Sequence, residues 1–461
     1  MPAFDNFKNI MKIISLPVQL DSSRCDKAIR ASFLHFTDDP EKSSNGWEYV
    51  EDGLLILKLG RVTALGKADD WFDFLPDGVE FYDFTGKLIM PGFIDTHTHY
   101  PQTDMIASHG EQLLEWLEKY TFPTEAKFSD INVANETADF FCDELLRNGT
   151  TTSAVFATVH PESVDAIFGA AQKRDMRLIS GKVMMDQNAP DFLCDTAESS
   201  YEDSAKLIEK WHGNGRALYA VTPRFVPTSS VDQLRVASRL CHEYKELYLQ
   251  THVAENADEV AWVSKLFPDR RSYLDVYEHY GLVGERSIYA HCIHLDQTDR
   301  KLMADRGAAM AFCPTSNLFL GSGLFDLDSA FQNNIRVGVA TDVGGGTSFS
   351  ILQTLNEAYK VSQMLGQTLT SMKAFYLATL GGAKALSLDH KLGNFELGKE
   401  ADFVVLDLES TPLMKRRMAN SDSIQDRLFA LMMLGDDRAI HATFVMGVCQ
   451  FMKGHSTCIK K

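Results

Sequence analysis

The chain has 461 residues, of which 45% are hydrophobic, so it can bury a large core and form more than one domain. Its net charge of −18 argues against nucleic acid or an anionic membrane surface as a partner, because both attract clustered positive charge. No run of 18 uncharged apolar residues occurs and the eight cysteines form no Cys-x-x-Cys pair, so we expect a cytoplasmic protein without a membrane-spanning helix.

The N-terminal segment predicts β-structure rather than a targeting signal. Residues 1–10 include Asp5 and lack an apolar stretch followed by small residues, so we expect no secretory signal. Short apolar runs follow at 28–36, 53–59 and 61–65. Turn-rich segments at 38–40 and 43–46 separate the first two of these runs, which is typical of a small β-domain.

The first long apolar strand ends in two histidines. His97 and His99 close the run 88–99, and on a strand two side chains at this spacing project from the same face. Two imidazoles that converge in this way supply half of a tetrahedral zinc or iron site. Such a pair also occurs as two ordinary surface histidines, so the metal interpretation depends on further ligands.

Seven more strand-like runs follow, and each has a polar residue at or near its C-terminal end. With the first run, they cover residues 88–99, 150–160, 177–186, 217–224, 247–252, 287–291, 308–317 and 336–342. Amphipathic helical patterns occupy several of the gaps, at 136–147, 164–173, 201–211 and 231–244. Eight alternating strands and helices with polar strand ends predict an α/β fold, a (β/α)8 TIM barrel. An open doubly wound sheet is the alternative, but no Gly-rich dinucleotide fingerprint follows an early strand.

The ends of the later strands supply the missing metal ligands. His252 ends the fifth run and Asp342 the eighth, so with His97 and His99 they offer three neutral nitrogens and one carboxylate. Such a set holds one divalent ion and leaves room for a water, whose pKa the ion lowers to about 7 in favourable sites. We expect Zn²⁺, one per subunit, with Fe²⁺ as the alternative.

Two further strand-end residues suit proton transfer. Glu255 lies three residues beyond His252, where the chain has left the strand and the carboxylate can reach the space in front of the metal. His291 ends the sixth run and would orient the water or stabilise charge that develops on it. A solvated helix-start glutamate and an ordinary core histidine are the alternatives. For Cys292 and Cys313, beside these positions, we expect buried packing.

Two absences limit the chemistry. Binuclear relatives of such barrels place a lysine at the end of the fourth strand, whereas this strand ends 221–225 (VTPRF), so we expect one metal. The other zinc-deaminase architecture needs His-x-Glu followed by Pro-Cys-x-x-Cys. Residues 109–111 (HGE) match the first half, but the second half is absent from the sequence.

These residues resemble the amidohydrolase superfamily in its mononuclear deaminase branch. The resemblance rests on 91–99 (PGFIDTHTH), 252–255 (HVAE), His291 and Thr341-Asp342. Within the superfamily, residues from about 90 to 438 are similar to the guanine deaminases. The specific segments are 114–123 (LEWLEKYTFP), 148–152 (NGTTT), 156–158 (FAT), 181–186 (GKVMMD), 221–225 (VTPRF), 313–318 (CPTSNL) and 434–438 (LGDDR).

The resemblance also implies the domain organisation. β-like runs follow the barrel at 393–406 and 440–451. We therefore expect residues 1–87 and 389–461 to form one composite β-sandwich domain, with the catalytic barrel of residues 88–388 inserted between them. Guanine deaminases are commonly dimers, so a homodimer is expected as well.

The resemblance assigns a role to each candidate residue. His97, His99, His252 and Asp342 would bind the metal, Glu255 would shuttle protons, and His291 would contact the water or the substrate. Arg224 would face the purine carbonyl, Phe225 would pack on the ring, and Gln102 would hydrogen-bond the Watson–Crick edge; a structural ion pair is the alternative for Arg224. Trp116 and Phe122 would wall the pocket, with simple packing as the alternative.

The implied activity is hydrolysis of guanine to xanthine and ammonia in purine catabolism. Water activated by the metal would lose a proton to Glu255 and attack the ring carbon that bears the amine, and Glu255 would pass the proton to a ring nitrogen. A deaminase of another amino-azine, such as 8-oxoguanine, cytosine or an s-triazine, would share every metal ligand. A non-catalytic scaffold would be expected to lose ligands, and here all are present.

Overall fold

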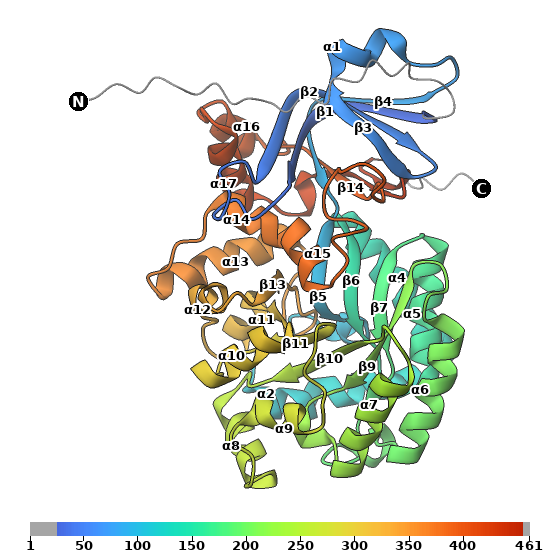
Figure 1. Ribbon diagram of the computed structural model, residues 1–461, viewed down its shortest axis with the longest axis vertical. Coiled ribbons are helices and arrows are strands. Elements are labelled where there is room, and N and C mark those ends of the chain that lie inside the picture. The colour runs from blue at the N-terminus through green and yellow to red at the C-terminus, as the bar shows by residue number, and fades with distance from the viewer. Residues whose placement is uncertain (1–24, 455–461) are drawn as a thin grey trace.

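The computed structural model describes residues 25–454 and shows the barrel expected from the sequence (Figure 1). The expectation about residues 1–10 lies outside the described residues. Eight strands form the barrel within this range, all parallel and hydrogen-bonded in chain order. They are β5 (Phe93–His99), β6 (Thr150–Phe156), β7 (Arg177–Gly181), β9 (Ala217–Pro223), β10 (Tyr248–Val253), β11 (Ser287–His291), β12 (Ala309–Phe312) and β13 (Arg336–Val339). The two-residue strand β8 (Val183–Met184) pairs with β9 beside this path.

The barrel is nearly closed where its first and last strands meet. The hydroxyl of Thr96 donates to the carbonyl of Val339 at 2.9 Å, which ties β5 to β13. A Cβ at Gly338 would lie 2.2 Å from Cγ2 of Thr96, so only glycine permits this approach of the two strands. The seam therefore brings the end of β13 directly beside the two histidines of β5.

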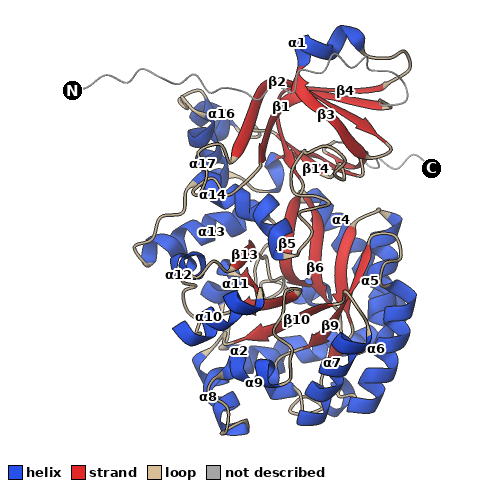
Figure 2. Cartoon of the chain, viewed as in Figure 1, coloured by secondary structure: helices blue, strands red, loops and turns tan. Residues whose placement is uncertain are grey.

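Helices surround the barrel strands, as Figure 2 shows. The four helices expected from the sequence are present as α4 (Ile131–Arg147), α5 (Pro161–Lys173), α6 (Ala197–Trp211) and α7 (Val231–Glu243). Further helices of the barrel include α8 (Ala257–Leu266), α9 (Tyr273–His279), α10 (Gln297–Arg306), α12 (Leu327–Gln332), α13 (Ile351–Met364) and α14 (Ser371–Tyr376). Asp130 caps α4 by accepting a hydrogen bond from the backbone N–H of Asn132, which explains why this helix begins before its amphipathic pattern.

Several strands end earlier than the sequence patterns suggested. β6 ends at Phe156 rather than near residue 160, β7 at Gly181 rather than 186 and β13 at Val339 rather than 342. β12 ends at Phe312 because Pro314 begins α11 (Pro314–Phe319). Proline is favoured at the first position of a helix, since its missing N–H has no partner there in any case. The residues that follow each strand, rather than the strands themselves, therefore carry several of the polar groups.

The terminal segments of the chain share a second sheet, drawn above the barrel in Figure 1. Within the described residues its order is β16-β15-β14-β4-β1-β2-β3, and only the β1–β4 pair is parallel. These strands are β1 (Lys27–Phe36), β2 (Trp47–Lys58), β3 (Arg61–Lys67), β4 (Glu80–Pro91), β14 (Phe403–Leu406), β15 (Ile440–Val445) and β16 (Val448–Met452). The composite β-structure is therefore built from both ends of the chain.

The junction of the two sheets lies within β4. Residues Leu88 and Met90 pair with Leu406 and Val404 of β14, so the strand continues past residue 87, where the division into domains was expected. Only Gly92 separates β4 from β5. The exact division into domains stays a prediction.

The C-terminal segment also contains helices that the sequence patterns did not predict. Helices α16 (Pro412–Met418) and α17 (Ile424–Leu434) lie between β14 and β15, and α17 packs against α13 and α14 of the barrel. Within residues 25–454 no helix has both the length and the apolar composition needed to cross a membrane.

Candidate active site

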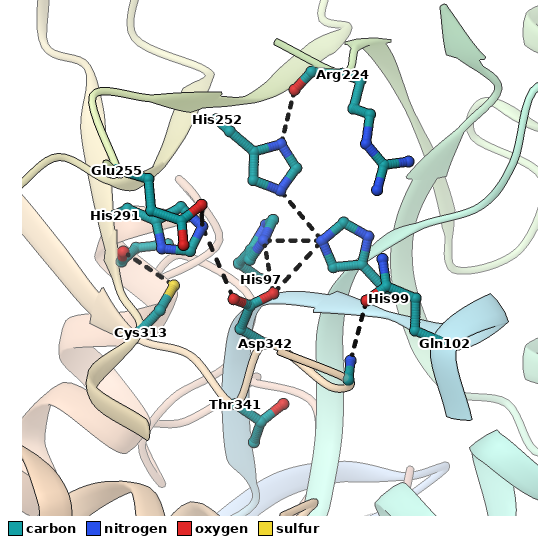
Figure 3. Close-up of polar contacts among 12 residues, drawn as sticks. His97, His99, Gln102, Arg224, His252, Glu255, His291, Cys313, Thr341 and Asp342 are labelled. Carbon is teal, nitrogen blue, oxygen red and sulfur yellow. Dashed lines mark hydrogen bonds and ion pairs between the residues drawn. The ribbon is translucent and has the colours of Figure 1, made fainter. Parts of the chain in front are cut away.

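Four expected metal ligands converge at the carboxyl ends of the barrel strands (Figure 3). Nε2 of His99 lies 3.2 Å from Nε2 of His97 and 3.1 Å from Nε2 of His252. Oδ1 of Asp342 lies 3.2 Å from Nε2 of His97 and 3.4 Å from Nε2 of His99. His97, His99 and Asp342 are buried and His252 is half-buried, and the four side chains come from β5, from β10 and from the loop after β13.

The spacing of these atoms fits ligands that share one metal ion. Nitrogen and oxygen ligands about 2.0–2.1 Å from an ion are separated from one another by about 2.9–3.6 Å when the angle at the ion is between about 90° and 120°. The four distances of 3.1–3.4 Å between the ligand atoms agree with this range. Ring nitrogens that face one another so closely cannot all be satisfied by mutual hydrogen bonds, whereas a shared cation satisfies every lone pair.

The charge states of the ligands also suit a cation. Burial, together with the neighbouring imidazoles, holds the pKa values of His99 and His252 well below their usual range. Burial lowers the pKa of His97 as well. For Asp342 burial acts to raise the pKa, but the interaction with His97 outweighs it and the net shift is downward. Three neutral nitrogens and one carboxylate therefore face the centre at neutral pH.

Neighbouring groups orient the ligands. Nδ1 of His252 donates to the carbonyl oxygen of Arg224 at 2.7 Å, which leaves Nε2 unprotonated and directed at the centre. The buried carboxylate of Asp95 accepts from the backbone N–H groups of His97, at 3.2 Å, and Thr341, at 3.1 Å. Asp95 therefore holds the ends of β5 and β13 in register, so that His97 and Asp342 meet.

Glu255 and His291 form a buried pair beside the ligands. Nε2 of His291 lies 3.3 Å from Oε2 of Glu255, and the hydroxyl of Ser322 donates to Oε1 of Glu255 at 3.0 Å. Burial raises the pKa of Glu255 to about 7. Nδ1 of His291 lies 2.8 Å from Oδ1 of Asn317, and donation from Nδ1 directs Nε2 toward Glu255. Burial acts to lower the pKa of His291, but the carboxylates of Glu255 and Asp342 reverse the shift, so the pKa is raised.

A pocket opens in front of this centre. Gln102, Trp116, Arg224, Phe225 and His291, the expected substrate-binding residues, all line it, together with Leu113, Leu117 and Leu320. Phe122 is buried, and its ring centroid lies 5.7 Å from the guanidinium carbon of Arg224. Phe122 therefore packs behind Arg224 and does not line the pocket, as its packing alternative predicted. The pocket has apolar walls around a few polar groups.

Sequence reasoning missed Glu125. This residue ends helix α3 (Phe122–Glu125) and is completely buried, and its carboxylate accepts hydrogen bonds from Gln102 and Arg224. It lies two residues beyond the segment 114–123 that resembles the guanine deaminases. No local pattern distinguishes it from a solvated glutamate in a helix.

Sequence reasoning also missed Glu259, although a helix-capping pattern in the sequence includes this residue. Its Oε2 accepts from the backbone N–H groups of Glu255, at 2.9 Å, and Asn256, at 3.2 Å, and so holds the loop that carries Glu255. Asn256 and Glu259 form a capping box at the start of α8, and the spacing Asn-x-x-Glu is a recognisable sequence signature of such a helix start.

Cys313 lies close to the metal ligands without matching their chemistry. Its Sγ lies within 4.8 Å of ligand atoms of His97, His291 and Asp342. Burial raises the pKa of the Cys313 thiol well above its usual range, so it stays protonated, and only a thiolate binds a metal strongly. Sγ instead donates to the carbonyl of Ala311 at 3.4 Å.

Comparison with known proteins identifies the family. The family model described as "Amidohydrolase family" matches residues 88–449. A guanine deaminase of Escherichia coli strain K12 is 55% identical over 424 residues, which cover 91% of this chain and 97% of the relative. A guanine deaminase of Dictyostelium discoideum is 38% identical over 377 residues, which cover 79% of this chain and 83% of the relative.

Solved structures agree with the sequence relatives. The structure of E. coli guanine deaminase superposes with a TM-score of 0.91 at 54% identity, and covers 93% of this chain and 100% of its own. A guanine deaminase from C. acetobutylicum with bound guanine in the active site gives a TM-score of 0.82 at 31% identity, with coverage of 92% and 100%. The chain therefore belongs to the amidohydrolase family and, within it, to the guanine deaminases.

Proposed function

We propose that this chain hydrolyses guanine to xanthine and ammonia. The observation that carries the proposal is the juxtaposition of four convergent metal-ligand side chains, a buried Glu255 and a pocket lined by Gln102, Arg224 and Phe225. A flat, uncharged purine with a carbonyl, a ring N–H and an amine matches this combination of aromatic surface and fixed polar groups.

One metal ion is proposed, Zn²⁺ with Fe²⁺ as the alternative, held by His97, His99, His252 and Asp342. When bound, such an ion acidifies water to a pKa of about 7 and polarises it for attack. A single ion is favoured because the fourth strand, β9, ends at Pro223 and is followed by Arg224 and Phe225 rather than by a lysine that could bridge two metals.

Glu255 is proposed as the proton carrier. Its carboxylate takes a proton from the attacking water and delivers it to a ring nitrogen of the purine, which makes the ring carbon easier to attack. A pKa of about 7, raised by burial, allows one group to accept and to release a proton near neutral pH. The Ser322 hydroxyl at Oε1 and His291 at Oε2 restrict the carboxylate to one orientation. His291 is placed to stabilise the charge that develops on the attacking oxygen. The carboxylate of Asp342 is proposed to assist catalysis by accepting a hydrogen bond from the water, which orients it.

The remaining pocket residues are proposed to bind the substrate. Arg224 uses Nη1 for Glu125, so its other N–H groups are available for the purine carbonyl. Gln102 offers an amide that both donates and accepts, and Phe225 packs on the ring. The indole N–H of Trp116 is buried and has no hydrogen-bond partner among residues 25–454, so it can donate to a ring nitrogen.

The cellular setting is proposed from the cysteine chemistry and the reaction. The seven cysteines in the described range are all unpaired thiols, which suits the reducing cytoplasm. A role in purine catabolism follows from the proposed reaction. The homodimer stays a prediction from the resemblance.

The activity can be tested directly. Purified protein is incubated separately with guanine, adenine, cytosine, 8-oxoguanine and ammeline, and ammonia release is measured. We expect guanine to give the highest kcat/KM. A higher kcat/KM with another of these bases would replace guanine as the substrate, while absence of ammonia from all five would contradict the deaminase function.

A further inference from the structure

A single buried carboxylate connects the two polar substrate-binding residues of the pocket. Oε1 of Glu125 accepts from Nε2 of Gln102 at 3.1 Å, and Oε2 accepts from Nη1 of Arg224 at 2.7 Å. Glu125 itself is completely buried and does not line the pocket, whereas Gln102 and Arg224 do. The carboxylate therefore stands behind both groups and acts on a ligand only through them.

The contacts of Gln102 determine the orientation of its amide. The backbone N–H of Gly344 donates to Oε1 of Gln102 at 3.3 Å, while Nε2 of Gln102 donates to Glu125. The reversed amide would place N–H against N–H at Gly344 and oxygen against carboxylate at Glu125, which leaves four buried groups unsatisfied. One N–H and one oxygen lone pair of Gln102 then remain for a ligand, at defined positions.

Glu125 also neutralises the pocket. Arg224 is buried, and an isolated guanidinium in such a place would attract anions strongly. The ion pair with Glu125 removes this net charge. Guanine is neutral, whereas its deamination product xanthine is acidic enough to ionise near neutral pH. A pocket without net charge at Arg224 therefore suits the substrate and does not retain the anionic product.

We propose that Glu125 is a positioning residue that sets the substrate specificity of this pocket: it orients the Gln102 amide and neutralises Arg224, so that neutral guanine binds in preference to anionic xanthine. The inference rests on the proposed guanine deamination, which it deepens. Glu125 forms no bond to the substrate and takes no part in proton transfer.

The first test is Glu125→Gln, which keeps the shape of the side chain and removes its charge. One oxygen can no longer accept from both Gln102 and Arg224, so either the Gln102 amide rotates or one donor is left unpaired. We expect the KM for guanine to rise by about tenfold or more, with a smaller change in kcat, because binding in ground state and transition state is weakened alike. At a pH where xanthine is an anion, the ratio of its inhibition constant to the guanine KM should fall.

The second test exchanges the amide of position 102 and the carboxylate of position 125, in the double variant Gln102→Glu/Glu125→Gln. The new carboxylate at position 102 can accept from Gly344 and from the new amide at position 125, whose oxygen accepts from Arg224. Hydrogen bonding and total charge are restored, but position 102 no longer donates to a ligand. We expect the melting temperature of the double variant to exceed that of Glu125→Gln, while the guanine KM stays high.

A matched control separates specificity from stability. Asp299 is a buried carboxylate that accepts from Arg271 and from Ser272 near the start of α10, away from the pocket. Asp299→Asn removes a comparable charge, so we expect a lower melting temperature with an unchanged guanine KM and unchanged xanthine inhibition. Metal content, measured in every variant, should equal that of the wild type.

Several outcomes would overturn the inference. The inference is wrong if Glu125→Gln has the wild-type guanine KM and the wild-type xanthine inhibition constant. It is also wrong if the variant binds guanine and xanthine more weakly by the same factor. If Glu125→Gln does not fold, a wild-type guanine KM in the double variant would overturn the inference instead. Failure of the wild-type protein to deaminate guanine would instead remove the proposed function, and the inference with it.

Discussion

Oε2 of Glu255 lies 3.3 Å from Nε2 of His291, and both side chains are buried next to the metal ligands. The pair joins a carboxylate whose pKa burial raises to about 7 with an imidazole whose own pKa is raised by that carboxylate and by Asp342 against the effect of burial. A proton can therefore be exchanged at this position without separating a large charge, which is what acid–base chemistry at neutral pH requires.

Glu255→Gln tests this arrangement. The amide keeps the contact with Ser322 but cannot carry a proton, so we expect kcat to fall by about two orders of magnitude or more, with metal content unchanged. Steady-state kinetics and metal analysis on the same preparation provide the measurement. Near-normal deamination by this variant would remove Glu255 from the mechanism.

His252→Ala and Asp342→Ala test the metal ligands. Each removes one of four groups whose ligand atoms lie 3.1–3.4 Å from a neighbouring ligand atom, so we expect loss of both metal and activity. Metal content is measured by elemental analysis after dialysis. Stoichiometric zinc in both variants would show that the ion is held by other residues.

Arg224 makes one contact through its backbone carbonyl and another through its side chain, and substitution removes only the side-chain contact. Its backbone carbonyl accepts from His252, whereas its side chain faces the pocket and Glu125. Arg224→Lys keeps the charge that balances Glu125 but loses the planar fork, so we expect kcat/KM for guanine to fall by about tenfold to a hundredfold. Arg224→Ala should lower it further. Zinc content should stay the same in both variants, and an unchanged kcat/KM would contradict the substrate-binding role.

A buried cluster of charged side chains around Glu400 predicts how the stability of the folded protein changes at low pH. Glu400 contacts Arg177 at 2.6 Å and Arg216 at 2.8 Å at the end of the barrel nearer the terminal sheet. Burial acts to raise the pKa of Glu400, but the two arginines outweigh it, so the folded-state pKa lies below the unfolded value. Its stabilising effect is therefore complete above the unfolded pKa and is lost as the pH falls through the folded pKa.

Glu400→Gln should accordingly destabilise the protein by about 3 kcal/mol at neutral pH, because two buried arginines lose a partner. The difference in Tm between wild type and variant is measured from about pH 7 down to about pH 3. It should stay constant down to about pH 5 and narrow as the pH falls below the unfolded pKa of about 4.3. A difference that stays constant over this interval would show that the charge of Glu400 contributes nothing.

The strand-end residues could be predicted from the sequence because their signals are local. His97 and His99 follow an apolar run directly, and His252 does the same, so the parallel topology alone brings them to one edge. Asp342 and His291 also lie at or just beyond the carboxyl ends of their strands, so the same parallel topology brings them to this edge. Each of these expectations needed only the position of a polar residue relative to its own strand.

Contacts that depend on irregular segments could not be predicted in this way. Glu125 meets Arg224 across 99 residues of sequence, through a short helix whose path no periodicity determines. Helices α16 and α17 were missed because they interrupt a segment whose flanking strands suggested β-structure. Asn317 lies in a segment that the resemblance included, yet only the structure shows that it orients His291.

The charge cluster around Glu400 has a consequence for biosynthesis. Arg177 and Arg216 belong to the first half of the barrel, whereas Glu400 and Asp402, which neutralise them, leave the ribosome after all eight barrel strands. Until then the two guanidinium groups lack the carboxylates of Glu400 and Asp402, and burying their charges without these carboxylates is costly. The order of translation therefore delays the final consolidation of the early barrel strands until the C-terminal segment has been synthesised.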